Sequence, residues 1–303
     1  MELFHTAFRA LGGPGEIHLA APNEAAARAG FQAALDEIDR VEIKYSRYRP
    51  ESLISRINTA AGGAPVACDA ETEGLLDYAH ALHAQSAGRF DISSGVWRRA
   101  WNFRDPQARI PTREELSALA PLVGWGRVER TPGHIRLPQA GMELDFGGIG
   151  KEYAVDRCAV VLMEAGTRHA LINLAGDLRA IGSKPDGGPW RVGIQHPNRA
   201  GEVMAELELK DGALTTSGDY ERCIWREGRR YGHLLEARGG WPVQHWRSIS
   251  VRAPSALLAG GLSTVAMLME AEGLALLQGA GVDFMAVDSQ GQVHTRAGTQ
   301  ALG

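Results

Sequence analysis

Residues 145–153 read Asp-Phe-Gly-Gly-Ile-Gly-Lys-Glu-Tyr, and an apolar pattern at helical spacing follows them directly. The predicted buried face of this helix contains five residues: Ala154, Val155, Cys158, Val161 and Leu162. The glycines would let the backbone approach a ligand closely, and Lys151 would lie in the first helical turn. Because free N–H groups and the positive end of the helix dipole meet there, the segment favours an anion such as phosphate.

The same segment lacks the established nucleotide-binding signatures. Glu152 follows the lysine, so the stretch is not a GxxxxGK[ST] loop, and it does not form GxGxxG within a βαβ unit. A glycine-rich connection between a strand and a helix would have a similar sequence. The local motif therefore leaves two interpretations open: a phosphate site and a plain structural turn.

Helix and strand signals on both sides of this segment predict an α+β fold, with mixed β-sheets covered by helices. Asn23 and Asp69 are expected to cap helices, and Thr112 with Glu115 forms a capping box. Short strands separated by turn residues are predicted in the second half, at 170–174, 190–194, 203–209, 221–225, 248–251 and 282–287. A further strand is expected at 16–21 and further helices near 150–165 and 257–269. A subdomain boundary near Pro138 is conceivable, but no linker marks it.

Composition excludes several classes of protein. The net charge of the 303 residues is −4, so no overall positive field would attract nucleic acid. The three cysteines are far apart and show no zinc or disulfide spacing. No apolar run is long enough to span a bilayer, and residues 1–10 do not read as a signal peptide. We therefore expect a cytoplasmic protein, or a periplasmic one if a leader had been removed.

Two polar clusters in the second half could carry chemistry. Residues 215–220, Thr-Thr-Ser-Gly-Asp-Tyr, would ring a polar ligand, although taken alone they favour a turn. His233 follows two basic residues on a predicted strand, and imidazole suits proton transfer near neutral pH. Trp101 and Phe103 could stack on a ring system, but core packing is the commoner role of such residues.

Taken together and in order, these segments resemble the FAD:protein FMN transferases, the ApbE family. The resemblance extends from about residue 8 to residue 269. It is carried by residues 11–17, 46–48, 52–58, 88–92, 101–103, 144–156, 172–177, 189–194, 216–222 and 231–233. It implies a single ApbE-like domain over residues 1–303, with a T-fold-related architecture.

The resemblance also implies an activity. Such enzymes bind FAD with a divalent metal, usually magnesium, and transfer the FMN moiety to a Ser or Thr hydroxyl of an acceptor protein, releasing AMP. The acceptor would be a flavoprotein, typically a redox subunit, while the transferase itself would not insert into a membrane. By the same resemblance, the residues with catalytic roles are His233, Lys151 and Asp219. Those expected to contact FAD are Asp91, Trp101, Gly147, Gly148, Gly150, Lys151, Thr216 and Ser217.

The metal position departs from the family pattern. Gly150 and Thr264 would bind the metal, but Gly260 occupies the place where the family has an aspartate four residues before that threonine. Such a site would bind Mg²⁺ mainly through the phosphates of FAD, and weakly before FAD binds. Glu236 is one candidate for a compensating carboxylate. Two alternative functions stay open: an FAD-binding protein without transferase activity, and a hydrolase that splits FAD with water.

Overall fold

The computed structural model describes residues 1–296 and 300–301 of the chain. The helices are α1 (Glu24–Tyr45), α2 (Leu53–Thr59), α3 (Ala70–Gln85), η1 (Ile92–Arg99), α4 (Arg113–Leu119), η2 (Ala120–Leu122), η3 (Trp125–Arg127), α5 (Gly150–Glu164), α6 (Ala256–Leu268), η4 (Glu270–Glu272) and α7 (Gly273–Ala280), where η marks 3₁₀ turns. The strands are β1 (Glu2–Ala10), β2 (Gly13–Ala21), β3 (Val66–Ala67), β4 (Glu129–Thr131), β5 (His134–Arg136), β6 (Ala170–Leu174), β7 (Asp177–Ile181), β8 (Trp190–Gln195), β9 (Val203–Leu209), β10 (Gly212–Gly218), β11 (Cys223–Arg226), β12 (Arg229–Gly232), β13 (Trp246–Ala253), β14 (Asp283–Asp288), β15 (Val293–Thr295) and β16 (Gln300–Ala301).

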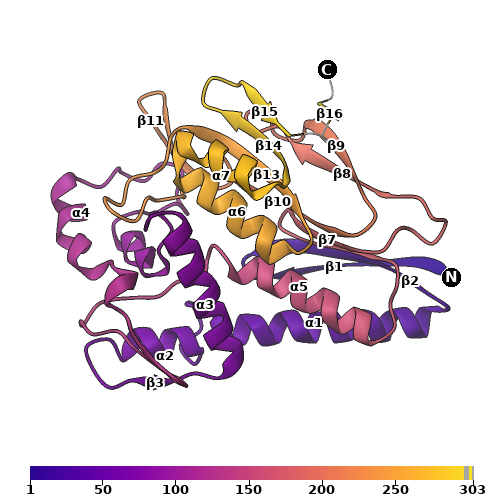
Figure 1. The fold of residues 1–303 in the computed structure, drawn as a ribbon, viewed down its shortest axis with the longest axis horizontal. Helices are drawn as coiled ribbons and strands as arrows, with labels where there is room; N and C mark the ends of the chain where they lie inside the picture. The colour runs from indigo at the N-terminus through magenta and orange to yellow at the C-terminus, as the bar shows by residue number, and fades with distance from the viewer. Residues whose placement is uncertain (297–299, 302–303) are drawn as a thin grey trace.

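An eight-stranded sheet forms the centre of the molecule, in the order β1-β2-β6-β7-β10-β13-β14-β15 (Figure 1). Neighbouring strands in this order pair antiparallel. Helices α1, α5 and α6 cover one face, and their apolar side chains share core clusters with β2, β6, β13 and β14. Strands β8 and β9 cover the other face, where Trp190 and Val192 pack with Leu214 and Met285. The expected α+β architecture is thereby confirmed.

The helix starts predicted from capping residues at Asn23, Asp69 and Thr112 are present in the structure. The Asn23 side chain accepts the Ala26 N–H at 2.9 Å at the start of α1, and Asp69 caps α3 in the same way. Both hydrogen bonds of the capping box at Thr112 are present at the start of α4. Because a cap depends on neighbours three residues away, sequence alone could predict these helix starts.

The polar run at residues 215–220 is a strand over most of its length, and the turn prediction for it is wrong. Residues 212–218 form β10, which lies between β7 and β13 in the middle of the sheet. Leu214 and Thr215 are buried by those partners. Pairing with β7 and β13 and the burial that comes with it outweigh the local preference of these residues for a turn.

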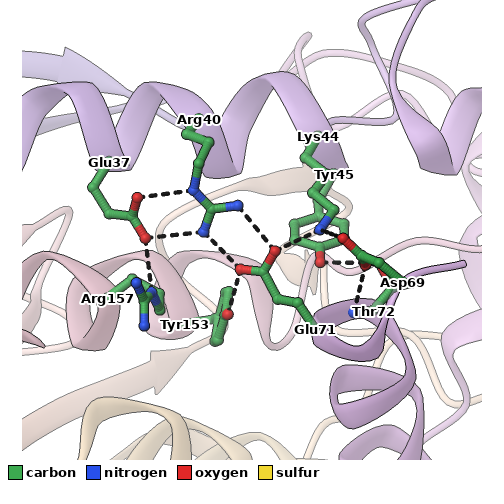
Figure 2. A network of polar contacts seen from close by, with 9 residues as sticks. All are labelled: Glu37, Arg40, Lys44, Tyr45, Asp69, Glu71, Thr72, Tyr153 and Arg157. Atoms are coloured by element: carbon green, nitrogen blue, oxygen red, sulfur yellow. Dashed lines mark hydrogen bonds and ion pairs between the residues drawn. The ribbon is translucent and has the colours of Figure 1, made fainter.

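A network of charged groups ties α1, α3 and α5 together (Figure 2). Glu71, in the first turn of α3, accepts hydrogen bonds from Arg40 and Lys44 of α1 and from the Tyr153 hydroxyl of α5. Tyr153 lies in the first turn of α5. The network therefore holds the start of α5 in place, directly beside the cavity described below.

No helix within the described residues combines the length and apolar character needed to cross a membrane.

Candidate functional site

A large cavity of about 1560 Å³ opens where the beginning of α5 meets the central sheet. Its wall is built by segments far apart in the chain: the β1–β2 turn, the end of α1, η1, the loop before α5, the ends of β6 and β10, the segment after β12, and α6. This volume exceeds that of typical small-molecule sites. There is room for a ligand as large as a dinucleotide.

The glycine-rich segment lies in the wall of this cavity, as the phosphate interpretation requires. Gly147, Gly148 and Gly150 all line it. Helix α5 begins at Gly150 without a side-chain cap on its first turn. A Cβ on Gly148 would lie 3.1 Å from the Phe90 ring, so a larger residue would push into the wall. The glycines thus leave the first turn of α5 accessible to an anion.

Lys151 supplies a full positive charge at the same place. Its ammonium forms an ion pair with Asp177 on β7, whose side chain is only 4% exposed. Burial lowers the pKa of Lys151, but the carboxylates of Asp177 and Glu152 more than offset this and raise it above its usual value. The lysine is therefore charged at any physiological pH. Asp177 lies in a segment that the resemblance included, but no local signal marked it as a partner of the lysine.

Glu152 is one of the site residues that sequence reasoning missed. Its side chain is 5% exposed, it lines the cavity, and its Oε2 has no hydrogen-bond partner among the described residues. Burial and the nearby Asp177 raise the pKa of its carboxyl group to about 7. A Cβ built on Gly260 of α6 would lie 2.4 Å from its Cγ, so Glu152 fills the space beside that glycine.

Three hydroxyl groups, those of Ser217, Ser263 and Thr264, gather where β10 faces α6, whereas the Thr216 hydroxyl bonds to Ser250 of β13. Thr216 and Ser217 line the cavity from β10, and Thr264 lines it from α6. The Ser217 Oγ lies 3.1 Å from the Thr264 Oγ1 and 2.8 Å from the Ser263 Oγ. The predicted metal ligand Thr264 is thus brought to the same cavity as Gly150. Among the described residues, His, Cys, Asp and Glu side chains nowhere form a group of three suited to a metal ion.

His233 follows β12 and lines the cavity as predicted. Its Nδ1 is buried and has no hydrogen-bond partner in the part of the chain that is described. Burial, followed by the positive charges of Arg98, Arg222 and Lys151, lowers the pKa of His233 to about 4. The imidazole is therefore neutral near pH 7 and can accept a proton.

Positive charge concentrates around this histidine. Arg98 and Arg222 line the cavity together with Lys151. Arg98 pairs with Asp145 at 3.1 Å, whereas Arg222 forms no ion pair among the described residues. Sequence reasoning did not single out either arginine. An anion such as a pyrophosphate would find several positive charges here, although the chain as a whole is negative.

Asp91 and Trp101 both line the cavity, but their polar groups are already engaged. The Asp91 carboxylate accepts hydrogen bonds from the Ser93 backbone at 2.7 Å and the Trp125 backbone at 2.9 Å. The Trp101 ring stacks on Phe103 at 5.3 Å, and its N–H donates to the Gly240 carbonyl. Each residue thus shapes the wall.

Asp219 does not line the cavity, unlike its neighbours Gly218 and Tyr220. Its buried carboxylate lies 2.6 Å from Arg230 and 2.7 Å from Arg247. Both arginines engage this carboxylate. A direct catalytic role for Asp219 stays a prediction. Glu236 also lies outside the cavity wall.

Comparisons with known proteins agree with this geometry. The model of the ApbE family matches residues 11–286. A relative named FAD:protein FMN transferase, from Treponema pallidum, is 30% identical and aligns over 89% of this chain and 81% of its own. One of the same name from Vibrio cholerae is 31% identical, over 80% and 75% of the two chains.

Solved structures extend the similarity to the fold. The ApbE protein of Thermotoga maritima has a TM-score of 0.89 at 27% identity, covering 98% of this chain and 97% of its own. The flavin transferase ApbE from Vibrio cholerae has a TM-score of 0.87 at 26% identity, covering 98% of both chains. The family model, the relatives and the shared fold lead to one conclusion: this chain belongs to the ApbE family.

Proposed function

We propose that this protein transfers the FMN moiety of FAD to a Ser or Thr hydroxyl of an acceptor protein and releases AMP. One observation carries the proposal: a neutral histidine with an unpartnered ring nitrogen shares a large cavity with Lys151 and the glycine-rich start of α5. Relatives that bear the name FAD:protein FMN transferase support it. We also propose that the chain is one functional domain, because its central sheet draws on strands from β1 to β15.

The reaction exchanges the phosphoanhydride bond of the FAD pyrophosphate for a phosphoester bond on the acceptor. The acceptor oxygen attacks the phosphorus on the FMN side of the pyrophosphate, the bridging P–O bond breaks, and the bridging oxygen leaves with AMP. The α5 N-terminus and Lys151 would hold the pyrophosphate oxygens and stabilise the charge that develops on them. The unpartnered Nδ1 of His233 would accept the proton of the attacking hydroxyl.

The residues present fit a divalent cation such as magnesium, which prefers oxygen ligands. Gly150 and Thr264 lie in the same cavity, and the orphaned Oε2 of Glu152 adds a buried oxygen without a partner. The Gly150 carbonyl and the Thr264 hydroxyl would hold the metal together with substrate phosphates. When bound, the metal would neutralise charge on the departing phosphate.

Asp219 takes a positioning role in this proposal. It joins Arg230 of β12 to Arg247 of β13, and would so fix the segment that carries Gly218 and Tyr220. The Thr216 and Ser217 hydroxyls would contact the substrate from β10. The acceptor, a redox flavoprotein by family resemblance, would enter from the open side of the cavity.

The test incubates purified protein with FAD, Mg²⁺ and an extract of the organism that encodes it. Transfer predicts a fluorescent acceptor band that is heavier by one FMN, with release of one AMP per acceptor. The His233→Gln variant should still bind FAD but transfer roughly 100- to 10,000-fold more slowly. AMP released without acceptor would identify a hydrolase, and FAD binding without AMP or labelled acceptor would identify a binding protein.

A further inference from the structure

The Glu152 carboxylate is a buried acid whose role the proposed reaction leaves undefined. It is 5% exposed, and its Oε2 has no hydrogen-bond partner within the described residues. Leaving a buried carboxylate oxygen without a partner costs free energy, so folded proteins rarely keep one without a reason. Since the oxygen belongs to a side chain in the cavity wall, a ligand in the cavity could supply the partner.

Two protein donors close to Glu152 bond to other residues. The Lys151 ammonium, on the adjacent residue, is paired with Asp177. The Tyr78 hydroxyl, which packs against the neighbouring Gly261, donates to the Leu257 carbonyl at 2.7 Å. Neither group donates a hydrogen bond to the Oε2 of Glu152. The missing partner is therefore best sought in the cavity, and a carboxylate there suits a cation.

The position of Glu152 relative to α6 indicates which cation. A Cβ on Gly260 would lie 2.4 Å from the Cγ, 3.1 Å from the Cδ and 3.2 Å from the Oε1 of Glu152. The glutamate thus occupies the space that a side chain at residue 260 would fill. Gly260 precedes Thr264 by four residues on α6, so the two share one helix face. Glu152 thus lies beside the residue that precedes Thr264 by one helical turn on α6.

We propose that Glu152 supplies the carboxylate ligand of the divalent cation, from α5, in place of a side chain at Gly260 of α6. The ligand set would be the Glu152 carboxylate, the Gly150 carbonyl, the Thr264 hydroxyl and substrate phosphate oxygens. One or two carboxylates with phosphates are the usual environment of Mg²⁺. The assignment rests on the proposed function, because substrate phosphates complete the site.

The test measures Mn²⁺ affinity by electron paramagnetic resonance, with the protein saturated with FAD. Glu152→Gln keeps the shape but removes the charge, and should weaken Mn²⁺ binding roughly 10- to 100-fold. Glu221→Gln is the matched control, since Glu221 is an exposed carboxylate on the same cavity, and should leave the affinity unchanged. Glu152→Gly combined with Gly260→Asp moves the carboxylate to α6 and should recover most of the lost affinity.

The possible failures are distinguishable. If Glu152→Gln binds Mn²⁺ as tightly as the natural protein while FAD binding and transfer persist, the ligand assignment is wrong and the proposed function stands. If the natural protein neither binds FAD nor labels an acceptor, the proposed function itself fails. Should the variants not fold, crystals of the natural protein with FAD and Mn²⁺ decide. An anomalous peak bonded to a Glu152 oxygen supports the assignment, and a peak remote from it overturns the assignment.

Discussion

Lys151 of α5 and Asp177 of β7 form an ion pair at the wall of the cavity, although the two residues lie in different layers of the fold. The aspartate is 4% exposed, so removing its charge would leave a largely buried ammonium without this partner. Asp177→Asn should therefore lower the free energy of unfolding by roughly 1–3 kcal/mol in flavin-free protein, because water can reach part of the lysine side chain, which is 30% exposed. Urea unfolding monitored by tryptophan fluorescence measures this change.

A surface pair provides the control for that experiment. Asp211 pairs with Arg179 at 3.0 Å, but its side chain is 71% exposed. Asp211→Asn should cost about 0–1 kcal/mol because water screens the exposed carboxylate. Equal losses from the two substitutions would mean that the Lys151–Asp177 pair does not depend on burial.

Glu71 should make stability fall in acid. Partial burial raises its pKa, but hydrogen bonds from Arg40, Lys44 and Tyr153 outweigh this, and its pKa is well below the usual value (Figure 2). A depressed pKa means that the stabilisation is complete above the unfolded-state value near 4.5 and is lost as the pH falls through the folded-state value. Glu71→Gln should thus cost roughly 2 kcal/mol at pH 7 and less at pH 3.

Unfolding by urea at pH 7 and pH 3 measures the Glu71 effect, with the exposed Glu51→Gln as the matched control. The control should show no comparable loss at either pH. A Glu71→Gln deficit that is as large at pH 3 as at pH 7 would contradict the electrostatic explanation. The result bears on function, because Glu71 anchors Tyr153 in the first turn of α5.

His233 also has a lowered pKa and so a pH dependence of its own, but here it is the charged form that the folded protein disfavours. Burial and the surrounding cations lower its pKa to about 4, while the unfolded chain has a value near 6.5. Between these values the unfolded state holds the extra proton, so stability decreases as the pH falls from about 6.5 toward 4. Nuclear magnetic resonance of the flavin-free protein should show one imidazole, absent in His233→Gln, that stays neutral at pH 5.5. A ring that titrates near pH 6.5 would refute this.

Sequence reasoning was reliable where structure depends on near neighbours and weaker where it depends on distant ones. The Asn23 cap and the glycine-rich start of α5 need only adjacent residues, and both were predictable. Thr216 pairs with Ser250, 34 residues later, and the pairing of β10 with β13 and β7 makes this apparent loop a strand. The engagement of Asp219 by Arg230 and Arg247 likewise depends on tertiary contacts.

The metal position also depends on distant contacts. In the sequence, Gly260 indicated only that a metal ligand was missing from α6. In space, Gly260 is where α6 makes room for Glu152 of α5. No periodicity or spacing connects the two residues, which lie on different helices. The proximity of Gly260 and Glu152, on which the proposed ligand role of Glu152 rests, is a tertiary contact between α5 and α6.

The contact between Gly260 and Glu152 makes a final prediction about stability. Replacing glycine by alanine inside a helix usually stabilises a protein by about 0.5–1 kcal/mol. Gly74→Ala in α3, where nothing lies within 4 Å of the new Cβ, should follow that rule. Gly260→Ala should instead destabilise by roughly 1–3 kcal/mol, because its Cβ would overlap the Glu152 side chain at 2.4 Å.

A double-mutant cycle tests whether Glu152 causes that penalty. In a Glu152→Gly background the obstructing side chain is gone, so Gly260→Ala should become neutral or stabilising there. The coupling measured by urea unfolding should then fall in the range of about 0.5–3 kcal/mol that is typical of residues in contact. Additive effects would show that the two residues do not compete for the same space, and would remove the steric basis for placing the Glu152 carboxylate beside Thr264.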